Sequence, residues 1–178
     1  MCPVRFLLKN DQSATIRTMQ LNDLAAIDAM HDRLSKQSLY KRYFVSYKPS
    51  LATLREQMQL SLHRGAALVA TLDSAPDEII GMAYYLLIPD DVGVAEPAFL
   101  VEDRFQGQGL GSALFYYLTQ EALSQALRGF RLFILLENQR MLRILDQKTF
   151  PTERHYRDGM YEVRLDFQVA ANDFMTGE

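Results

Sequence analysis

Residues 92–127 read VGVAEPAFLVEDRFQGQGLGSALFYYLTQEALSQAL, and this stretch decides the fold. The apolar segment 92–101 predicts a strand, and the cluster Gln106-Gly107-Gln108-Gly109-Leu110-Gly111 predicts a tight turn after it. Apolar residues then recur at helical spacing as far as Gly129, a natural helix stop. The apolar run 130–136 predicts a second strand, buried on both faces beside a parallel neighbour. Together these segments form one predicted βαβ unit.

The glycine turn is suited to a ligand that carries phosphate. Glycines let the backbone approach such a ligand closely, and a helix N-terminus adds unpaired N–H groups with partial positive charge. A P-loop requires a lysine after the glycines, and none follows here. A Rossmann fingerprint requires G-x-G-x-x-G and a carboxylate about 20 positions later, and 127–131 contains none. Both patterns are excluded, whereas a tight turn with glycines kept only for packing remains an alternative.

The remaining segments predict one mixed α/β domain with a single clear parallel crossover. We predict strands at 14–19, 66–72, 78–88 and 161–167, and helices from about residue 22 and over 38–44, 51–62 and 138–148. We expect a lead-in over 1–13, in which 4–8 could add an edge segment, a single domain over 14–168 and a tail over 169–178.

Composition excludes several classes of function. The 178 residues suit one core, and a net charge of -3 argues against nucleic acid as the partner. The only cysteine, Cys2, cannot form an internal disulfide. No apolar run reaches the roughly 18 residues that span a bilayer, and the first twenty residues lack a secretory core, so we expect no membrane partner and a cytoplasmic location. His31, His63 and His155 are scattered, so we expect no metal site and interpret them as surface or helix residues.

The glycine turn resembles the Q/R-x-x-G-x-G/A acetyl-CoA signature of the GCN5-related N-acetyltransferase (GNAT) family, and Asn138-Gln139-Arg140-Met141 resembles that family's N-x-x-A/M helix start. The element order is similar to GNAT from residue 14 to about 168. Two segments, LYKRYF at 39–44 and Ala95-Glu96, resemble the GNAT domains of bacterial protein lysine acetyltransferases. The resemblance implies a mixed sheet of about six or seven strands, mostly antiparallel with one splayed parallel pair, and helices on both faces.

The resemblance also implies acetyl-CoA as co-substrate, with its pantetheine arm along the first strand of the unit and its thioester in the gap between 92–101 and 130–136. The implied cofactor-binding residues are Phe99, Leu100 and Val101 on the strand, Gln106, Gly107, Gln108, Gly109, Leu110, Gly111 and Ser112 at the turn, and Asn138 and Met141 on the next helix. A plain helix N-cap explains Asn138 almost as well.

Acetyl transfer to an amine requires a neutral amine, and a lysine side chain with a pKa of about 10.4 is mostly protonated at neutral pH. Glu96 is the candidate general base, since it lies on the strand that feeds the turn and matches the Ala-Glu position of the subgroup; we expect it to be partly buried. The alternative is a strand-edge carboxylate in a surface salt bridge. Pro97 departs from the subgroup and fits only at a strand edge or a bulge. Leu145 stands where many GNAT enzymes have a tyrosine acid, so no general acid is assigned.

The sequence therefore predicts an acetyl-CoA-dependent N-acetyltransferase that transfers directly to a primary amine, with a protein lysine as one candidate acceptor. Two alternatives stay open: a non-catalytic acyl-CoA sensor, which the departures at Pro97 and Leu145 favour, and an acetyltransferase for small-molecule amines. We expect a monomer or homodimer. The aromatic residues Tyr40, Tyr43 and Phe44 are expected to form the wall of the acceptor side or to pack in the core.

Overall fold

One sheet of eight strands carries helices on both faces in the computed structural model, which describes residues 1–147 and 150–167. The strands are β1 (Val4–Leu7), β2 (Ser13–Thr18), β3 (Gly65–Leu72), β4 (Ala75–Leu87), β5 (Val94–Val101), β6 (Gly129–Leu135), β7 (Thr152–Arg157) and β8 (Met160–Asp166). The helices are α1 (Leu24–Asp32), α2 (Lys36–Tyr43), α3 (Leu51–Arg64), α4 (Leu110–Ser124) and α5 (Gln139–Asp146), with short 3-10 turns η1 (Leu21–Asp23) and η2 (Asp103–Phe105).

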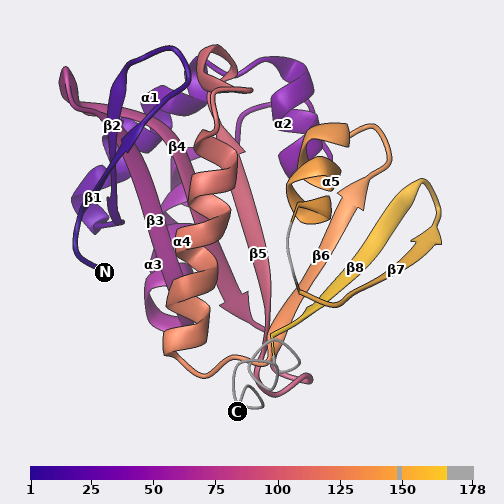
Figure 1. Ribbon diagram of the computed structural model, residues 1–178. Helices are drawn as coiled ribbons and strands as arrows, with labels where there is room; N and C mark the ends of the chain where they lie inside the picture. The colour runs from indigo at the N-terminus through magenta and orange to yellow at the C-terminus, as the bar shows by residue number, and fades with distance from the viewer. Residues whose placement is uncertain (148–149, 168–178) are drawn as a thin grey trace.

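The order across the sheet is β1-β2-β3-β4-β5-β6-β8-β7, and the pairing is antiparallel everywhere except between β5 and β6. These two strands pair only at Val94 with Gly129 and at Ala95 with Phe130, and then they diverge (Figure 1). The mixed sheet with one splayed parallel pair is thus confirmed, although the sheet has eight strands rather than six or seven.

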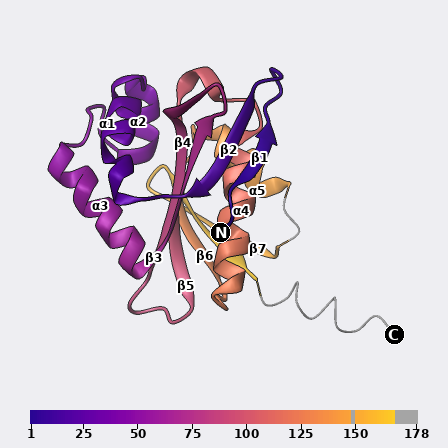
Figure 2. The ribbon, with the colours of Figure 1, turned by 90° about the vertical axis from the view of Figure 1, so that its left-hand side faces the viewer.

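Helices α1, α2 and α3 cover one face of the sheet, and α4 and α5 cover the other (Figure 2). Ser35 and Ser50 cap α2 and α3, because each hydroxyl accepts a hydrogen bond from the backbone N–H three residues later. In the described part of the chain, no helix combines the length and the hydropathy needed to cross a bilayer.

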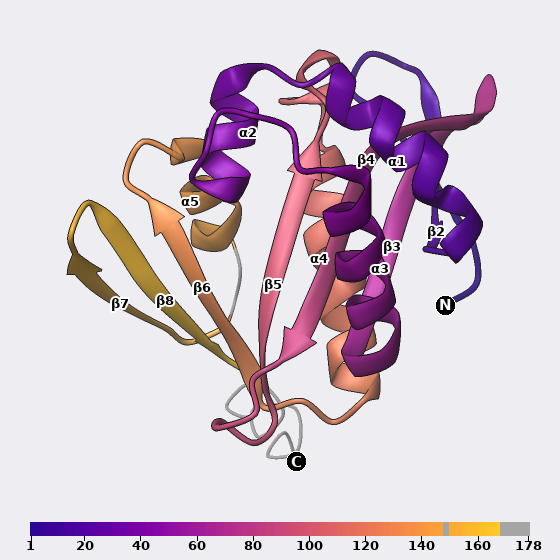
Figure 3. The same ribbon diagram turned by 180° about the vertical axis from the view of Figure 1, so that it is seen from behind.

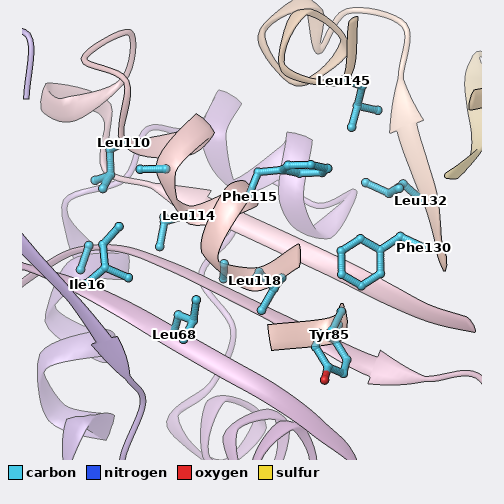
Figure 4. Packing of buried hydrophobic residues seen from close by; sticks show 14 of the residues in the cluster. Ile16, Leu68, Tyr85, Leu110, Leu114, Phe115, Leu118, Phe130, Leu132 and Leu145 are labelled. Atoms are coloured by element: carbon cyan, nitrogen blue, oxygen red, sulfur yellow. The ribbon is translucent and has the colours of Figure 1, made fainter. Parts of the chain in front are cut away.

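The larger core lies between α4 and the sheet. Leu110, Leu114 and Leu118 are fully buried along one side of α4 and point toward β2, β3 and β4 (Figure 4). Burial of each such leucine contributes about 1.5–3 kcal/mol, so this helix holds its N-terminus at a fixed place over the sheet. A second buried cluster lies between the sheet and the helices α1 and α3.

The edge segment considered at 4–8 is confirmed, since β1 pairs with β2. Two other features differ from the prediction. Strand β7 was not predicted, because its sequence TERHYR is polar and its side chains are mostly exposed. Strand β6 is not buried on both faces: Phe133 is 44% exposed, because β5 has diverged from β6 at that level. The predicted tail, 169–178, lies outside the described residues.

Candidate active site

The glycine turn combines two left-handed residues with a free helix N-terminus. Gly107 and Gly109 have φ angles of +78° and +92°, and Gly109 is the N-cap of α4. Ala113 is the first residue of α4 whose N–H reaches back to the Gly109 carbonyl, at 3.1 Å. The N–H groups at positions 110–112 therefore have no partner within the helix, which makes this turn suitable for an anion.

The glycines serve packing as well as backbone conformation. A Cβ atom at Gly109 would lie 3.3 Å from Phe6, and one at Gly111 would lie 3.2 Å from Ile144. A Cβ at Gly107 would meet nothing within 4 Å, so packing does not require glycine there. Its positive φ favours glycine, and the space beside it is open. Packing alone therefore does not account for the whole glycine motif.

A cavity of about 330 Å³ opens at this turn. All predicted cofactor residues line it except Gln108 and Leu110, namely Phe99, Leu100, Val101, Gln106, Gly107, Gly109, Gly111, Ser112, Asn138 and Met141. The Gln108 carbonyl accepts a hydrogen bond from the Lys9 N–H at 3.1 Å, and the Leu110 side chain is fully buried in the core. The side chains of these two residues are thus not among those that line the cavity, and their role in cofactor binding stays a prediction.

Among the described residues, five cationic side chains and no carboxylate also line this cavity: Lys9, Lys41, Arg42, Arg140 and Arg143. Lys9 arrives from the loop after β1, Lys41 and Arg42 from α2, and the other two from α5. The prediction did not include them, although Arg140 and Arg143 lie three positions apart on a helix and so share a face. The excess of positive charge suits phosphate groups.

Gln106 joins the turn to the neighbouring elements. Its side-chain amide donates to the Val101 carbonyl at 2.9 Å and to the Ser38 hydroxyl at 3.0 Å, and its oxygen accepts from Arg140. Ser38 donates to Asp103 at 2.9 Å. Burial tends to raise the pKa of Asp103, but hydrogen bonds from Ser35 and Ser38 outweigh it and hold that pKa below its ordinary value. The charged carboxylate thus anchors α2 to the turn.

The edge of β5 that faces β6 is open. The Val94 carbonyl accepts from the Ile88 N–H, and the Glu102 N–H donates to the Ile80 carbonyl, so even-numbered residues direct their backbone groups to β4. Odd-numbered residues therefore direct theirs into the gap. Pro97 is one of them, so it removes no hydrogen bond from the ladder with β4.

The open edge decides between the two explanations of Pro97. Pairing of β4 with β5 runs without a register shift from Gly81 opposite Val101 to Leu87 opposite Ala95. The interpretation of Pro97 as a bulge is therefore wrong, and its position at an unpaired edge explains it. The N–H groups of Phe99 and Val101 face the same gap.

A second cavity, of about 560 Å³, adjoins the first, and Lys41, Arg42, Phe99, Asn138 and Met141 line both. Glu96 lines the second cavity only. Its side chain is exposed, so the expected partial burial is wrong. Among the described residues, Glu96 has no ion-pair partner within 4.0 Å, so the alternative of a surface salt bridge finds no support.

One aromatic residue, at the C-cap of α2, forms part of the second cavity. Phe44 is 45% exposed and lines it, whereas Tyr43 is largely covered, and burial raises the pKa of Tyr43 to about 12. The Arg42 guanidinium lies 4.7 Å from the centre of the Tyr43 ring and 5.3 Å from that of Tyr84, and it donates to the Tyr84 hydroxyl. These contacts hold Arg42 in place between the two cavities.

Other predicted residues are placed as follows. Asn138 caps α5 by accepting from the Met141 N–H at 3.4 Å, so the N-cap explanation is confirmed. It also lines both cavities, and its cofactor contact stays a prediction. Leu145 is buried in the core. His31 lies on α1, as a helix residue, and is buried there: its ring nitrogens lie 2.7 Å from the Ile27 carbonyl and 2.7 Å from the Tyr43 hydroxyl. Within residues 1–147 and 150–167, no three His, Cys, Asp or Glu side chains form a group that could hold a metal.

Comparison with known proteins agrees with this geometry. Residues 33–149 match the family model of the acetyltransferase (GNAT) family. The chain is 29% identical over 113 residues to acetyltransferase Pat of Mycolicibacterium smegmatis; the match covers 64% of this chain but only 34% of that protein. The crystal structure of the GNAT domain of S. lividans PAT superposes with a TM-score of 0.81 at 24% identity, over 93% of this chain and 97% of that one. The structure of yncA, a putative acetyltransferase from Salmonella typhimurium with its cofactor acetyl-CoA, superposes with a TM-score of 0.68 at 18% identity, over 85% and 91% of the two chains. The chain belongs to the acetyltransferase (GNAT) family.

Proposed function

We propose that the protein is an N-acetyltransferase that uses acetyl-CoA and transfers the acetyl group directly to a primary amine. The observation that carries the proposal is the open edge of β5, which runs from an anion-binding turn into a second cavity that contains Glu96. A donor and an acceptor can meet there without a covalent enzyme intermediate. Protein lysine is the first acceptor to test, since segments 39–44 and Ala95-Glu96 resemble protein lysine acetyltransferases.

The residues of the first cavity fit acetyl-CoA. The free N–H groups at positions 110–112 and the surrounding lysines and arginines suit the pyrophosphate. The N–H groups of Phe99 and Val101 suit the amide carbonyls of the pantetheine arm, as a strand edge suits a peptide. When bound, acetyl-CoA supplies an acetyl thioester, whose carbonyl carbon accepts a nucleophile while the thiolate leaves. The yncA structure holds acetyl-CoA on the same fold.

Glu96 acts on the acceptor. A lysine amine with an ordinary pKa of about 10.4 enters mostly as an ammonium, which cannot attack. Glu96 accepts the proton from this ammonium, directly or through one water, and the neutral nitrogen then forms the N–C bond as the C–S bond breaks. A base so placed typically contributes about 10²–10⁴-fold to the rate. Because Leu145 is buried and has no ionisable group that could donate a proton, the leaving thiolate takes its proton from solvent or from the acceptor.

The experiment combines binding and turnover. Calorimetry with CoA tests the donor site, and thiol release from acetyl-CoA with lysine peptides and small amines tests transfer. We expect Glu96→Gln to lower kcat by about 10²-fold or more, whereas Glu153→Gln, an exposed change on β7, keeps the wild-type rate. No binding of CoA by the wild-type protein, or unchanged turnover in Glu96→Gln when chemistry limits the rate, would contradict the proposal.

A sensor without turnover is the second candidate, and the buried Leu145 in place of a tyrosine acid favours it. A sensor binds CoA in the same calorimetric experiment but releases no thiol with any acceptor. The acceptor panel also separates an enzyme for small amines, which modifies those amines and leaves lysine peptides unchanged.

A further inference from the structure

The second cavity contains an arginine that the proposed chemistry does not use. Arg131 lies on β6, lines the second cavity and does not line the first. Its Nε atom is buried without a hydrogen-bond partner, and its guanidinium lies 5.8 Å from the centre of the Phe133 ring. A buried donor without a partner costs free energy, so such groups in native proteins commonly await a ligand or a water.

The carboxylates of the described residues do not neutralise Arg131. Glu162, which is opposite Phe133 in register, is bonded to Arg164 at 3.3 Å. Among the described residues, no carboxylate lies within 4.0 Å of the Arg131 guanidinium. Lys41 and Arg42 line the same cavity and also have no carboxylate partner there. Among the described residues that line it, the cavity thus has three cations against one carboxylate, Glu96.

Glu96 and Arg131 are neighbours in the fold. Ala95 and Phe130 form the last parallel pair before the strands diverge, and both side chains belong to the core under α4. Because side chains alternate along a strand, the next residues, Glu96 and Arg131, lie side by side on the opposite face (Figure 3 views the sheet from this face). They form no ion pair within 4.0 Å. Among the described residues, the closed end of the gap thus presents one unpaired carboxylate and one unpaired guanidinium.

We infer that the acceptor carries a carboxylate near its reactive amine in space, and that Arg131 binds this carboxylate while the amine lies at Glu96. The inference rests on the proposed function. A guanidinium offers paired donors that match a carboxylate, and the cations of the cavity repel an acceptor whose amine has basic neighbours. Two sources have this chemistry: a free amino acid, and a lysine flanked by acidic residues.

Matched acceptors separate the two sources. The first pair compares a peptide that has aspartate and glutamate beside its lysine with the same peptide in which asparagine and glutamine replace them. The second pair compares free amino acids with their carboxamides. The wild-type protein should favour the carboxylate member of one pair by about 10- to 100-fold in kcat/KM, the range expected for a hydrogen bond between charged groups. The pair that shows this preference identifies the source.

Variants test whether Arg131 is the cause. We expect Arg131→Gln to abolish the preference and leave the KM for acetyl-CoA unchanged, and Arg131→Lys to retain part of the preference. Arg157→Gln, which removes an exposed arginine, is the charge-matched control and should keep the preference in full. Circular dichroism and thermal unfolding establish that each variant is folded. Equal rates on both pairs in the wild-type protein, or an intact preference in Arg131→Gln, would overturn the inference.

Product binding gives a readout that does not need turnover. Calorimetry measures the affinity of N-acetylated peptides and N-acetyl amino acids, with their amide counterparts, in the presence of CoA. Wild-type protein should bind the carboxylate forms more tightly, and Arg131→Gln should not discriminate. Loss of turnover with this discrimination intact counts against the proposed function alone, whereas absence of discrimination with intact turnover counts against the role of Arg131 alone.

Discussion

Glu102 provides the sharpest test of how the cofactor strand is held. Its side chain is 1% exposed and accepts from Arg33 Nε at 2.8 Å and from Arg104 Nε. Arg33 also donates to the Ile79 carbonyl at 2.8 Å, so this network ties the end of α1 to β4 and to the end of β5. The two arginines differ in exposure, at 31% for Arg33 and 60% for Arg104.

The change Glu102→Gln keeps the shape of the side chain and removes its charge. One of its two acceptor sites becomes an amide donor that faces a guanidinium, and Arg33 loses a charged partner in a partly covered site. Breaking a buried ion pair costs about 3–5 kcal/mol, and exposed pairs contribute about 0–1 kcal/mol. Because Arg33 is about one-third exposed, we take the low end, about 3 kcal/mol. That loss lowers Tm by about 6–12 °C in a chain of this size.

Urea unfolding followed by far-UV circular dichroism measures these differences. We expect a loss of about 3 kcal/mol for Glu102→Gln, about 2 kcal/mol for Arg33→Gln and less than about 1 kcal/mol for Arg104→Gln, in the order of burial. Glu153→Gln, an exposed change on β7, should stay within about 0.5 kcal/mol of the wild-type protein. A loss in Arg104→Gln as large as that in Arg33→Gln, or no loss in Glu102→Gln, would refute the reasoning.

Three further predictions concern the turn and the helices around it. Gly109→Ala should cost about 1–3 kcal/mol in urea unfolding and raise the KM for acetyl-CoA, because an alanine is strained at a φ of +92° and its Cβ meets Phe6 at 3.3 Å; an unchanged KM with normal stability contradicts this. Gln106→Ala should raise the KM for acetyl-CoA with little change in kcat, since the amide that orders the Val101 carbonyl is lost; a fall in kcat alone argues for a different role. Burial lowers the pKa of His31 in the folded protein. As pH drops below about 6.5, the imidazole is therefore protonated in the unfolded chain before it is protonated in the folded one, and the free energy of unfolding falls. His31→Gln should make this fall smaller, and equal pH profiles for the two proteins count against the buried imidazole as its cause.

The parts of the fold that depend on local pattern were predictable from the sequence. The βαβ unit and the positions of its turn and helix follow from apolar periodicity and from glycines that the backbone requires at φ of +78° and +92°. Strand β7 was not predictable, because a polar strand at the sheet edge has no buried face and therefore no alternation. The exposure of Phe133 was not predictable either, since it results from the divergence of β5 and β6 rather than from the sequence of β6.

The candidate site also has a part that local sequence predicts, the glycine turn, and a part that depends on tertiary structure, the second cavity proposed for the acceptor. The anion binding proposed for the turn uses backbone N–H groups, so a few successive residues, from Gly107 to Ser112, contain most of the information about it. Lys9 is an exception, because a hairpin that pairs β1 with β2 brings it to the turn from the other end of the chain. The Lys9 N–H donates to the Gln108 carbonyl, and a local sequence pattern cannot predict such a contact between distant residues.

The acceptor half depends on side chains from separate elements, so acceptor choice can change while donor binding stays the same. Arg42 of α2 is positioned by Tyr84 of β4, and Glu96 of β5 adjoins Arg131 of β6 only because Ala95 and Phe130 pair where the strands meet. None of these residues belongs to the glycine turn. Under the proposed function, a substitution at position 131 should therefore alter which amines enter without disturbing the first cavity, which Arg131 does not line. Selectivity among relatives of this fold should follow such positions on α2 and β6 rather than the turn.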